Sequence, residues 1–128
     1  MPANGQPSVS QDDYLERIWE LIQRKGYARI VDLAADLGVR QASASTMVKR
    51  LAQAKLLKRE AYRGFVLTPA GRERAEYIHE RHQVLAEFFQ ALGVDAATAG
   101  KDIDGIEHHL SPRTVQALKR AIRKLTAV

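Results

Sequence analysis

The segment from residue 30 to residue 67 constrains the fold of this chain more than any other part. Its first half carries apolar residues at helical spacing on both sides of a short Gly38–Val39 turn, which predicts helices at 30–37 and 41–54. The residues expected on the inner face of the second helix are Ala44, Met47, Val48 and Leu51. Two helices joined by a short glycine-containing turn form a helix-turn-helix.

Two short runs of strand-forming residues follow this pair of helices. The runs Leu56–Arg59 and Gly64–Leu67 flank Glu60–Arg63, a stretch of turn-forming and charged residues. Such a pattern predicts a small antiparallel hairpin. A helix-turn-helix followed directly by a hairpin has the outline of a winged helix-turn-helix.

The chain on either side of this segment is expected to be helical. Ser10 begins a helix that ends at Gly26, because one apolar stripe at the i, i+3, i+4, i+7 spacing lies between them. That stripe consists of Leu15, Ile18, Trp19 and Ile22. After the hairpin, Thr68–Pro69 starts a long helix to Leu92, since threonine caps helices and proline suits their first turn.

Further helices are expected at residues 96–110 and 112–125. Three helices alone would leave apolar faces exposed to water, and packing against a second copy would cover them. We therefore expect a homodimer.

Composition narrows the class of protein. The chain has a formal net charge of +5 and no cysteine, so any metal must be held by oxygen and imidazole nitrogen. No apolar run approaches the ~20 residues of a membrane span, and no secretion signal is visible. We expect a cytoplasmic protein that has no membrane partner.

The basic residues gather on the predicted winged helix. No acidic residue lies between Asp36 and Glu60. The outward face of the helix at 41–54 and the hairpin present small, hydroxylated, amide and basic groups, which suit base edges and phosphates in a major groove. The candidate DNA contacts are Arg40, Gln41, Ser43, Ser45, Thr46, Lys49, Arg50 and Arg63. This surface predicts binding to double-stranded DNA.

A second set of residues has the chemistry of a metal site. Its members are Asp13, Glu16, His82, Asp104, Glu107 and His108. The last three follow one another at i, i+3 and i+4 and would share one face of a helix. Each residue also has a simpler explanation: Asp13, three residues after Ser10, suits a helix capping box. Together, oxygen and nitrogen donors without sulfur favour a hard or borderline divalent ion.

These observations predict a mainly α fold: a winged helix-turn-helix DNA-binding domain plus an all-helical dimerisation domain. Residues 1–9 are expected to be a flexible tail, residues 10–68 the DNA-binding domain, and residues 69–128 the helical dimerisation and metal-binding domain.

Three stretches carry a resemblance to a known family. The segments Gly26–Arg29, Tyr62–Thr68 and Gly105–Leu110 resemble the diphtheria toxin repressor family, and within it the manganese transport regulator branch. The resemblance covers nearly the whole chain from about Ser10. It implies a homodimeric, non-enzymatic regulator with metal sites between its two domains, and no room for the SH3-like third domain of the iron-responsive branch.

The resemblance also implies roles for the six candidate ligands, which all match family positions. Asp13 and Glu107 stand where iron-responsive relatives carry a thioether or a thiol, which implies Mn²⁺ as the cofactor, with Fe²⁺ or Co²⁺ as alternatives and one or two ions per subunit. Asp104 stands where some members carry the longer glutamate. The implied outcome is repression of manganese uptake genes.

Three other functions fit parts of the sequence. A winged-helix regulator that senses a small organic ligand would make the acidic cluster structural. A metal-dependent hydrolase would use the histidine-carboxylate cluster to activate water, but no general base or oxyanion site accompanies it. A protein-interaction module would use the helix-turn-helix shape without binding DNA.

Overall fold

The computed structural model describes residues 10–127. The flexible tail expected at residues 1–9 lies outside the described residues. The chain divides into two compact units, one ending at Tyr77 and the other beginning at Ile78. Each unit is described by itself below. Because the division falls inside one helix, the domain boundary expected at residue 68 stays a prediction.

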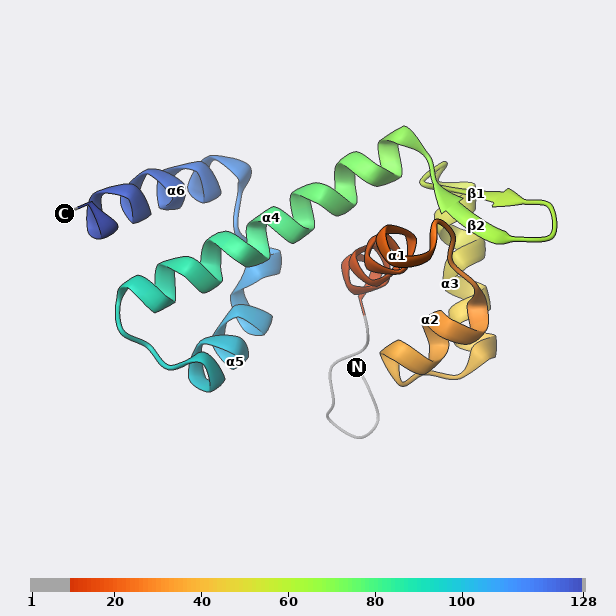
Figure 1. Ribbon diagram of the computed structural model, residues 1–128, viewed down its shortest axis with the longest axis horizontal. Coiled ribbons are helices and arrows are strands. Elements are labelled where there is room, and N and C mark those ends of the chain that lie inside the picture. The colour runs from red at the N-terminus through yellow and green to blue at the C-terminus, as the bar shows by residue number, and fades with distance from the viewer. Residues whose placement is uncertain (1–9, 128) are drawn as a thin grey trace. The chain divides into compact units, whose positions relative to one another are not determined.

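The first unit contains three helices and a two-stranded antiparallel sheet, followed by the first turns of a long helix (Figure 1). In chain order these elements are α1 (Gln11–Lys25), α2 (Ile30–Leu37), α3 (Gln41–Gln53), β1 (Leu57–Glu60), β2 (Gly64–Leu67) and α4 (Pro69–Ala91). The predicted mainly helical fold with a hairpin wing is confirmed.

Helix α1 begins and ends as the sequence predicts. The Ser10 side chain accepts a hydrogen bond from the Asp13 backbone N–H, and the Asp13 side chain accepts one from the Ser10 backbone N–H, which completes a capping box. Gly26 ends the helix at φ 84°, a left-handed conformation that glycine adopts without strain. The face buried in the core consists of Tyr14, Leu15, Ile18 and Leu21. Trp19 and Ile22 are only half-buried.

Helices α2 and α3 form the helix-turn-helix. Gly38 at φ 66° ends α2, and its backbone N–H donates to the carbonyls of Ala34 and Ala35. The buried residues of α3 are Ala44, Val48 and Leu51, while Met47 is half-buried. Arg40 precedes α3 without a side-chain capping hydrogen bond.

The hairpin pairs one residue later than the sequence suggested. The first strand was expected to begin at Leu56, but the ladder begins with Leu57 opposite Leu67. The backbone of Leu56 is already used: its N–H donates to the Leu51 carbonyl at 2.9 Å and its carbonyl accepts from the Thr68 N–H at 3.1 Å. Leu56 therefore joins the end of α3 to the start of α4.

The start of α4 packs closely on that same residue. Thr68 caps the helix by accepting a hydrogen bond from the Gly71 N–H at 3.1 Å. A Cβ atom added at Gly71 would lie 2.0 Å from the Leu56 carbonyl oxygen, so only glycine allows this approach.

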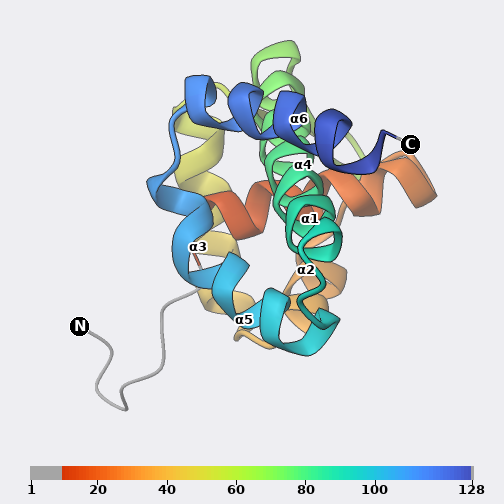
Figure 2. The same cartoon turned by 90° about the vertical axis from the view of Figure 1, so that its left-hand side faces the viewer.

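The second unit contains the rest of α4, helix α5 (Ala96–Ile106), a 3-10 turn η1 (Glu107–His109) and helix α6 (Pro112–Thr126). Figures 1 and 2 both show α5 and α6 on opposite sides of the C-terminal part of α4. Leu85 of α4 packs with Ala99 and Ile103 of α5, and Leu118 of α6 joins this cluster. Lys119 of α6 also forms an ion pair with Glu80 of α4.

Helix α5 is shorter than the sequence suggested. It was expected to continue to Leu110, but it ends at Ile106 and tightens into η1. A 3-10 turn has 3.0 residues per turn where an α-helix has 3.6, so side chains after Ile106 leave the faces that α5 defines. None of the helices described for residues 10–127 is both long and apolar enough to cross a membrane.

Candidate metal centre and nucleic-acid interface

Glu107 is the central residue of the candidate metal centre. It is the first residue of η1, and only 4% of its surface is exposed. A carboxylate taken out of water needs a cation or hydrogen-bond donors nearby. The Glu107 Oε2 atom lies 3.1 Å from Nδ1 of His82, which comes from α4. One oxygen of the buried carboxylate thus meets an imidazole from another helix.

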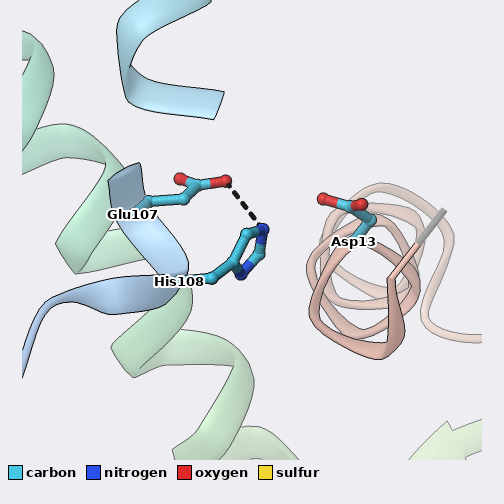
Figure 3. A group of neighbouring side chains, drawn as sticks. All are labelled: Asp13, Glu107 and His108. Atoms are coloured by element: carbon cyan, nitrogen blue, oxygen red, sulfur yellow. Dashed lines mark ion pairs between the residues drawn. The ribbon is translucent and has the colours of Figure 1, made fainter. Parts of the chain in front are cut away.

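The second oxygen of Glu107 meets another imidazole. Nε2 of His108 lies 3.6 Å from Glu107 Oε1, the pair drawn in Figure 3. Both histidine side chains are partly exposed to solvent. Three of the six candidate ligands, His82, Glu107 and His108, are therefore brought together within the second unit.

Asp104 does not join this group in the way the spacing predicted. Asp104 and His108 are exposed, whereas Glu107 is buried. The prediction that these three residues share one helical face is wrong, because α5 ends at Ile106 and the 3-10 turn directs Glu107 into the protein.

The donor set of the second unit fits a divalent cation. It offers two carboxylate oxygens and two imidazole nitrogens and no sulfur, within one cluster on a buried carboxylate. Imidazole and carboxylate together suit a hard or borderline ion. The ion would be held by His82, Glu107 and His108, and its positive charge would offset the buried negative charge.

Asp13 and Glu16 lie in the first unit, on α1. Asp13 Oδ2 accepts a hydrogen bond from the Ser10 backbone N–H at 2.9 Å, so the predicted capping role is confirmed. That contact engages one carboxylate oxygen. Figure 3 includes Asp13 on its helix. Glu16 follows one turn later and is half-buried.

The predicted DNA contacts of α3 lie on one exposed surface. Arg40, Gln41, Ser43, Thr46, Lys49 and Arg50 are exposed, and Ser45 is half-buried. The Thr46 hydroxyl donates to the Ala42 carbonyl at 3.0 Å, which leaves its oxygen able to accept a further hydrogen bond. On the wing, Arg63 is exposed as well.

Sequence reasoning missed two residues beside the wing. The guanidinium carbon of Arg29 lies 5.2 Å from the centre of the Tyr27 ring, and that of Arg63 lies 5.8 Å from the same centre. Tyr27 and Arg29 follow Gly26 at the end of α1, and nothing in their spacing indicates the hairpin as a neighbour. The signals available in the sequence were an aromatic residue two positions before an arginine and the resemblance of the segment Gly26–Arg29 to a known family.

Comparison with known proteins identifies the family. Residues 8–65 match the family described as iron dependent repressor, N-terminal DNA binding domain. Residues 68–127 match the family described as iron dependent repressor, metal binding and dimerisation domain. The two matches together cover almost the whole chain.

Relatives agree with these matches. The chain is 39% identical to the HTH-type transcriptional regulator MntR of Listeria welshimeri over 117 residues, which cover 91% of this chain and 82% of that protein. It is 44% identical to the protein of the same name from Geobacillus kaustophilus over 105 residues, 82% of this chain and 74% of the relative.

Solved structures have the same fold. The manganese regulator SloR matches with a TM-score of 0.78 at 25% identity, over 89% of this chain and 54% of SloR. A manganese-dependent transcriptional repressor in complex with manganese matches with a TM-score of 0.74 at 26% identity, over 88% of this chain and 52% of the repressor. This chain thus spans about half the length of those two proteins.

The family consists of transcriptional regulators and not of enzymes, which agrees with the expectation that this chain has no catalytic activity. The expected DNA-binding, metal-binding and dimerisation functions are confirmed by the two domain matches. The chain belongs to the iron dependent repressor family, as a metal-dependent DNA-binding transcriptional regulator.

Proposed function

We propose that this regulator responds to manganese and represses manganese uptake genes when manganese is abundant. The single observation that carries the proposal is the buried Glu107 carboxylate with an imidazole nitrogen near each oxygen. Two relatives are named as a manganese regulator and as a manganese-dependent repressor, which supports the choice of ion.

The donor chemistry also favours manganese over softer metals. The described centre has no sulfur ligand, and the whole chain has no cysteine. Carboxylate oxygen suits Mn²⁺, whereas thiolates select softer ions. Because raw affinity order disfavours manganese, selectivity must come from ligand type and geometry.

We assign Asp13 and Glu16 of α1 as the ligands that the first unit contributes. Both carry carboxylates on the same capped helix, and the capping contact of Asp13 engages only one of its two oxygens. Asp104 completes the proposed set; it is exposed and stands three residues before Glu107.

The proposed switch rests on repulsion among these carboxylates. Two carboxylates about 5 Å apart repel by roughly 3 kcal/mol at an effective dielectric near 20. A divalent cation bound between the carboxylates would replace this repulsion with attraction to the cation. Asp13 and Glu16 then hold α1 to the dimerisation domain, and the two recognition helices of the dimer keep a spacing of about 34 Å, which suits successive major grooves.

The test is a manganese titration read in two ways. Calorimetry of the chain with MnCl₂ measures binding directly, and a labelled fragment of the regulator's own upstream DNA reports operator affinity with manganese and with a chelator. We expect saturable binding and at least a tenfold gain in DNA affinity. No heat of binding would favour the small-ligand regulator, and equal DNA affinity in both conditions would contradict the switch.

A further inference from the structure

A hollow lined by three arginines lies between the wing, the start of α2 and α3. Its volume is about 310 Å³, and its lining includes Arg29, Arg59 and Arg63 but no acidic residue. Phe65 and Val48 contribute apolar side chains to the lining. Three guanidinium groups around one hollow create a concentrated positive charge, and guanidinium groups recognise the oxygens of phosphates through paired hydrogen bonds.

Tyr27 fixes two of these arginines. The guanidinium groups of Arg29 and Arg63 both lie over its ring, at 5.2 and 5.8 Å from the centre. The negative face of an aromatic ring attracts a cation, so one ring holds two like charges that would otherwise separate. The arrangement orders both side chains before any ligand arrives, which reduces the entropy lost on binding.

The backbone beneath them is equally constrained. Ala28 pairs with Phe65 through two hydrogen bonds of 2.9 Å each, which attaches the segment after α1 to the wing. The Arg29 Nε–H donates to the Arg63 carbonyl at 3.4 Å. Gly64 permits this close approach, because a Cβ atom there would lie 2.2 Å from the Ala28 carbonyl oxygen.

One carboxylate lies near this cluster without neutralising it. Glu60 Oε2 is 4.0 Å from Nη1 of Arg63, at the outer limit of an ion pair, and both side chains are exposed. In the described part of the chain, the lining of the hollow carries three positive charges and no carboxylate, and Glu60 beside it offsets only part of that charge. The surplus is available to an anionic partner.

We propose that Arg29, Arg59 and Arg63 bind one phosphate of the DNA backbone beside the wing, with Tyr27 as the positioning residue. This inference rests on the proposed function and adds a contact outside the recognition helix. A phosphate contact fixes the position of the protein on the duplex and carries no sequence information. Its signature is therefore a change in the salt dependence of binding to any duplex.

The experiment measures binding of the full chain, with manganese present, to a fluorescein-labelled 24-base-pair duplex of arbitrary sequence across a range of KCl concentrations. We expect Arg29→Ala to weaken binding roughly tenfold at low salt, as for a lost hydrogen bond to a charged group. It should also reduce the slope of log K against log salt by about 0.9. Arg24→Ala is the matched control, because Arg24 is exposed in the same unit and paired with Asp36.

Tyr27 variants separate positioning from folding. Tyr27→Phe keeps the ring and should bind like the unmodified chain. Tyr27→Leu should weaken binding about threefold while keeping the salt slope, because the charges remain but lose their order. Thermal melts establish that each variant is folded. If Arg29→Ala is unstable, Arg59→Ala carries the same test.

The outcomes distinguish this inference from the proposed function. If the unmodified chain fails to bind duplex even at low salt, the proposed function is contradicted. If it binds and both Arg29→Ala and Arg59→Ala keep its salt slope, as Arg24→Ala should, the phosphate site is overturned. Equal losses for Tyr27→Phe and Tyr27→Leu would overturn the positioning role of the ring.

Discussion

His82 and Glu107 are 25 residues apart in the chain, and their side chains meet at 3.1 Å between Nδ1 and Oε2. The contact joins α4 to the turn that follows α5, inside one compact unit. It places a metal-binding imidazole on a buried carboxylate that has His108 beside its other oxygen. The proposed binding of a divalent metal ion follows from this arrangement.

The first prediction concerns the charge of Glu107. Glu107→Gln keeps the size of the side chain and removes the negative charge, so it should weaken manganese binding at least tenfold, a loss of about 1.4 kcal/mol. Calorimetry measures it. Asp104→Asn is the matched control: its carboxylate is exposed, and its substitution should weaken binding less. The reverse order of effects would contradict the central place of Glu107.

The second prediction concerns stability. An ion that binds only the folded state stabilises the protein. The gain is about 2.7 kcal/mol when the ion concentration is one hundred times the dissociation constant. Manganese should therefore raise the melting temperature in calorimetry, and a chelator should reverse the rise. His82→Ala should abolish the rise. A melting temperature that does not change when manganese is added would contradict manganese binding at this site.

The third prediction concerns Ser10, which caps α1 and holds Asp13. Ser10→Ala should destabilise the chain by about 0.5–2 kcal/mol, the usual effect of losing a cap. It should also lower manganese affinity, because the capping box orients the Asp13 carboxylate. Ser111→Ala is the control, since Ser111 caps α6 in the same way. A loss of manganese affinity in both variants would show that Ser10 acts through stability alone.

The fourth prediction concerns Gly64 in the wing. Its φ of 118° and the 2.2 Å separation between an added Cβ and the Ala28 carbonyl oxygen make alanine incompatible with the Ala28–Phe65 pairing. Gly64→Ala should cost roughly 1–3 kcal/mol of unfolding free energy and weaken duplex binding. In Gly38→Ala the added Cβ would meet no atom within 4 Å, so the loss of unfolding free energy should come only from the strain of its backbone conformation. Chemical denaturation compares the two variants.

The fifth prediction concerns the cap of α5. A hydrogen bond from the Thr98 backbone N–H lowers the pKa of Asp95, so folding favours its ionised form. This stabilisation is fully present above the pKa of an unfolded aspartate and is lost as pH falls through the lowered folded value. Asp95→Asn keeps an acceptor without a charge. Melting temperatures should therefore fall less steeply in this variant than in the unmodified chain between about pH 7 and about pH 3.

The sequence predicted the first unit well, because its signals are local. The Gly38 turn, the Ser10 capping box and the two strand-forming runs of the hairpin each depend on neighbouring residues. The one-residue shift at Leu56 arose because its backbone groups bond to Leu51 and Thr68, a competition that strand propensity does not register.

The candidate site was harder to predict where its geometry depends on tertiary packing. No proline or capping residue marks the end of α5 at Ile106, so the pattern suggested a longer helix with Asp104 and Glu107 on one face. The cluster of Tyr27 with Arg29 and Arg63 depends on pairing between Ala28 and Phe65, which are distant in sequence. Spacing along the chain carries no trace of such a contact.

The change from α5 to a 3-10 turn makes metal binding sensitive to chain length as well as to residue type. Adding a single alanine after Gly100, where an added Cβ would meet no atom within 4 Å, would turn everything downstream by about 100° relative to α4. Every donor atom would be retained, yet the Glu107 carboxylate would leave His82. Homologues with an altered interval between these two positions should therefore differ in metal response even when all their ligands are identical.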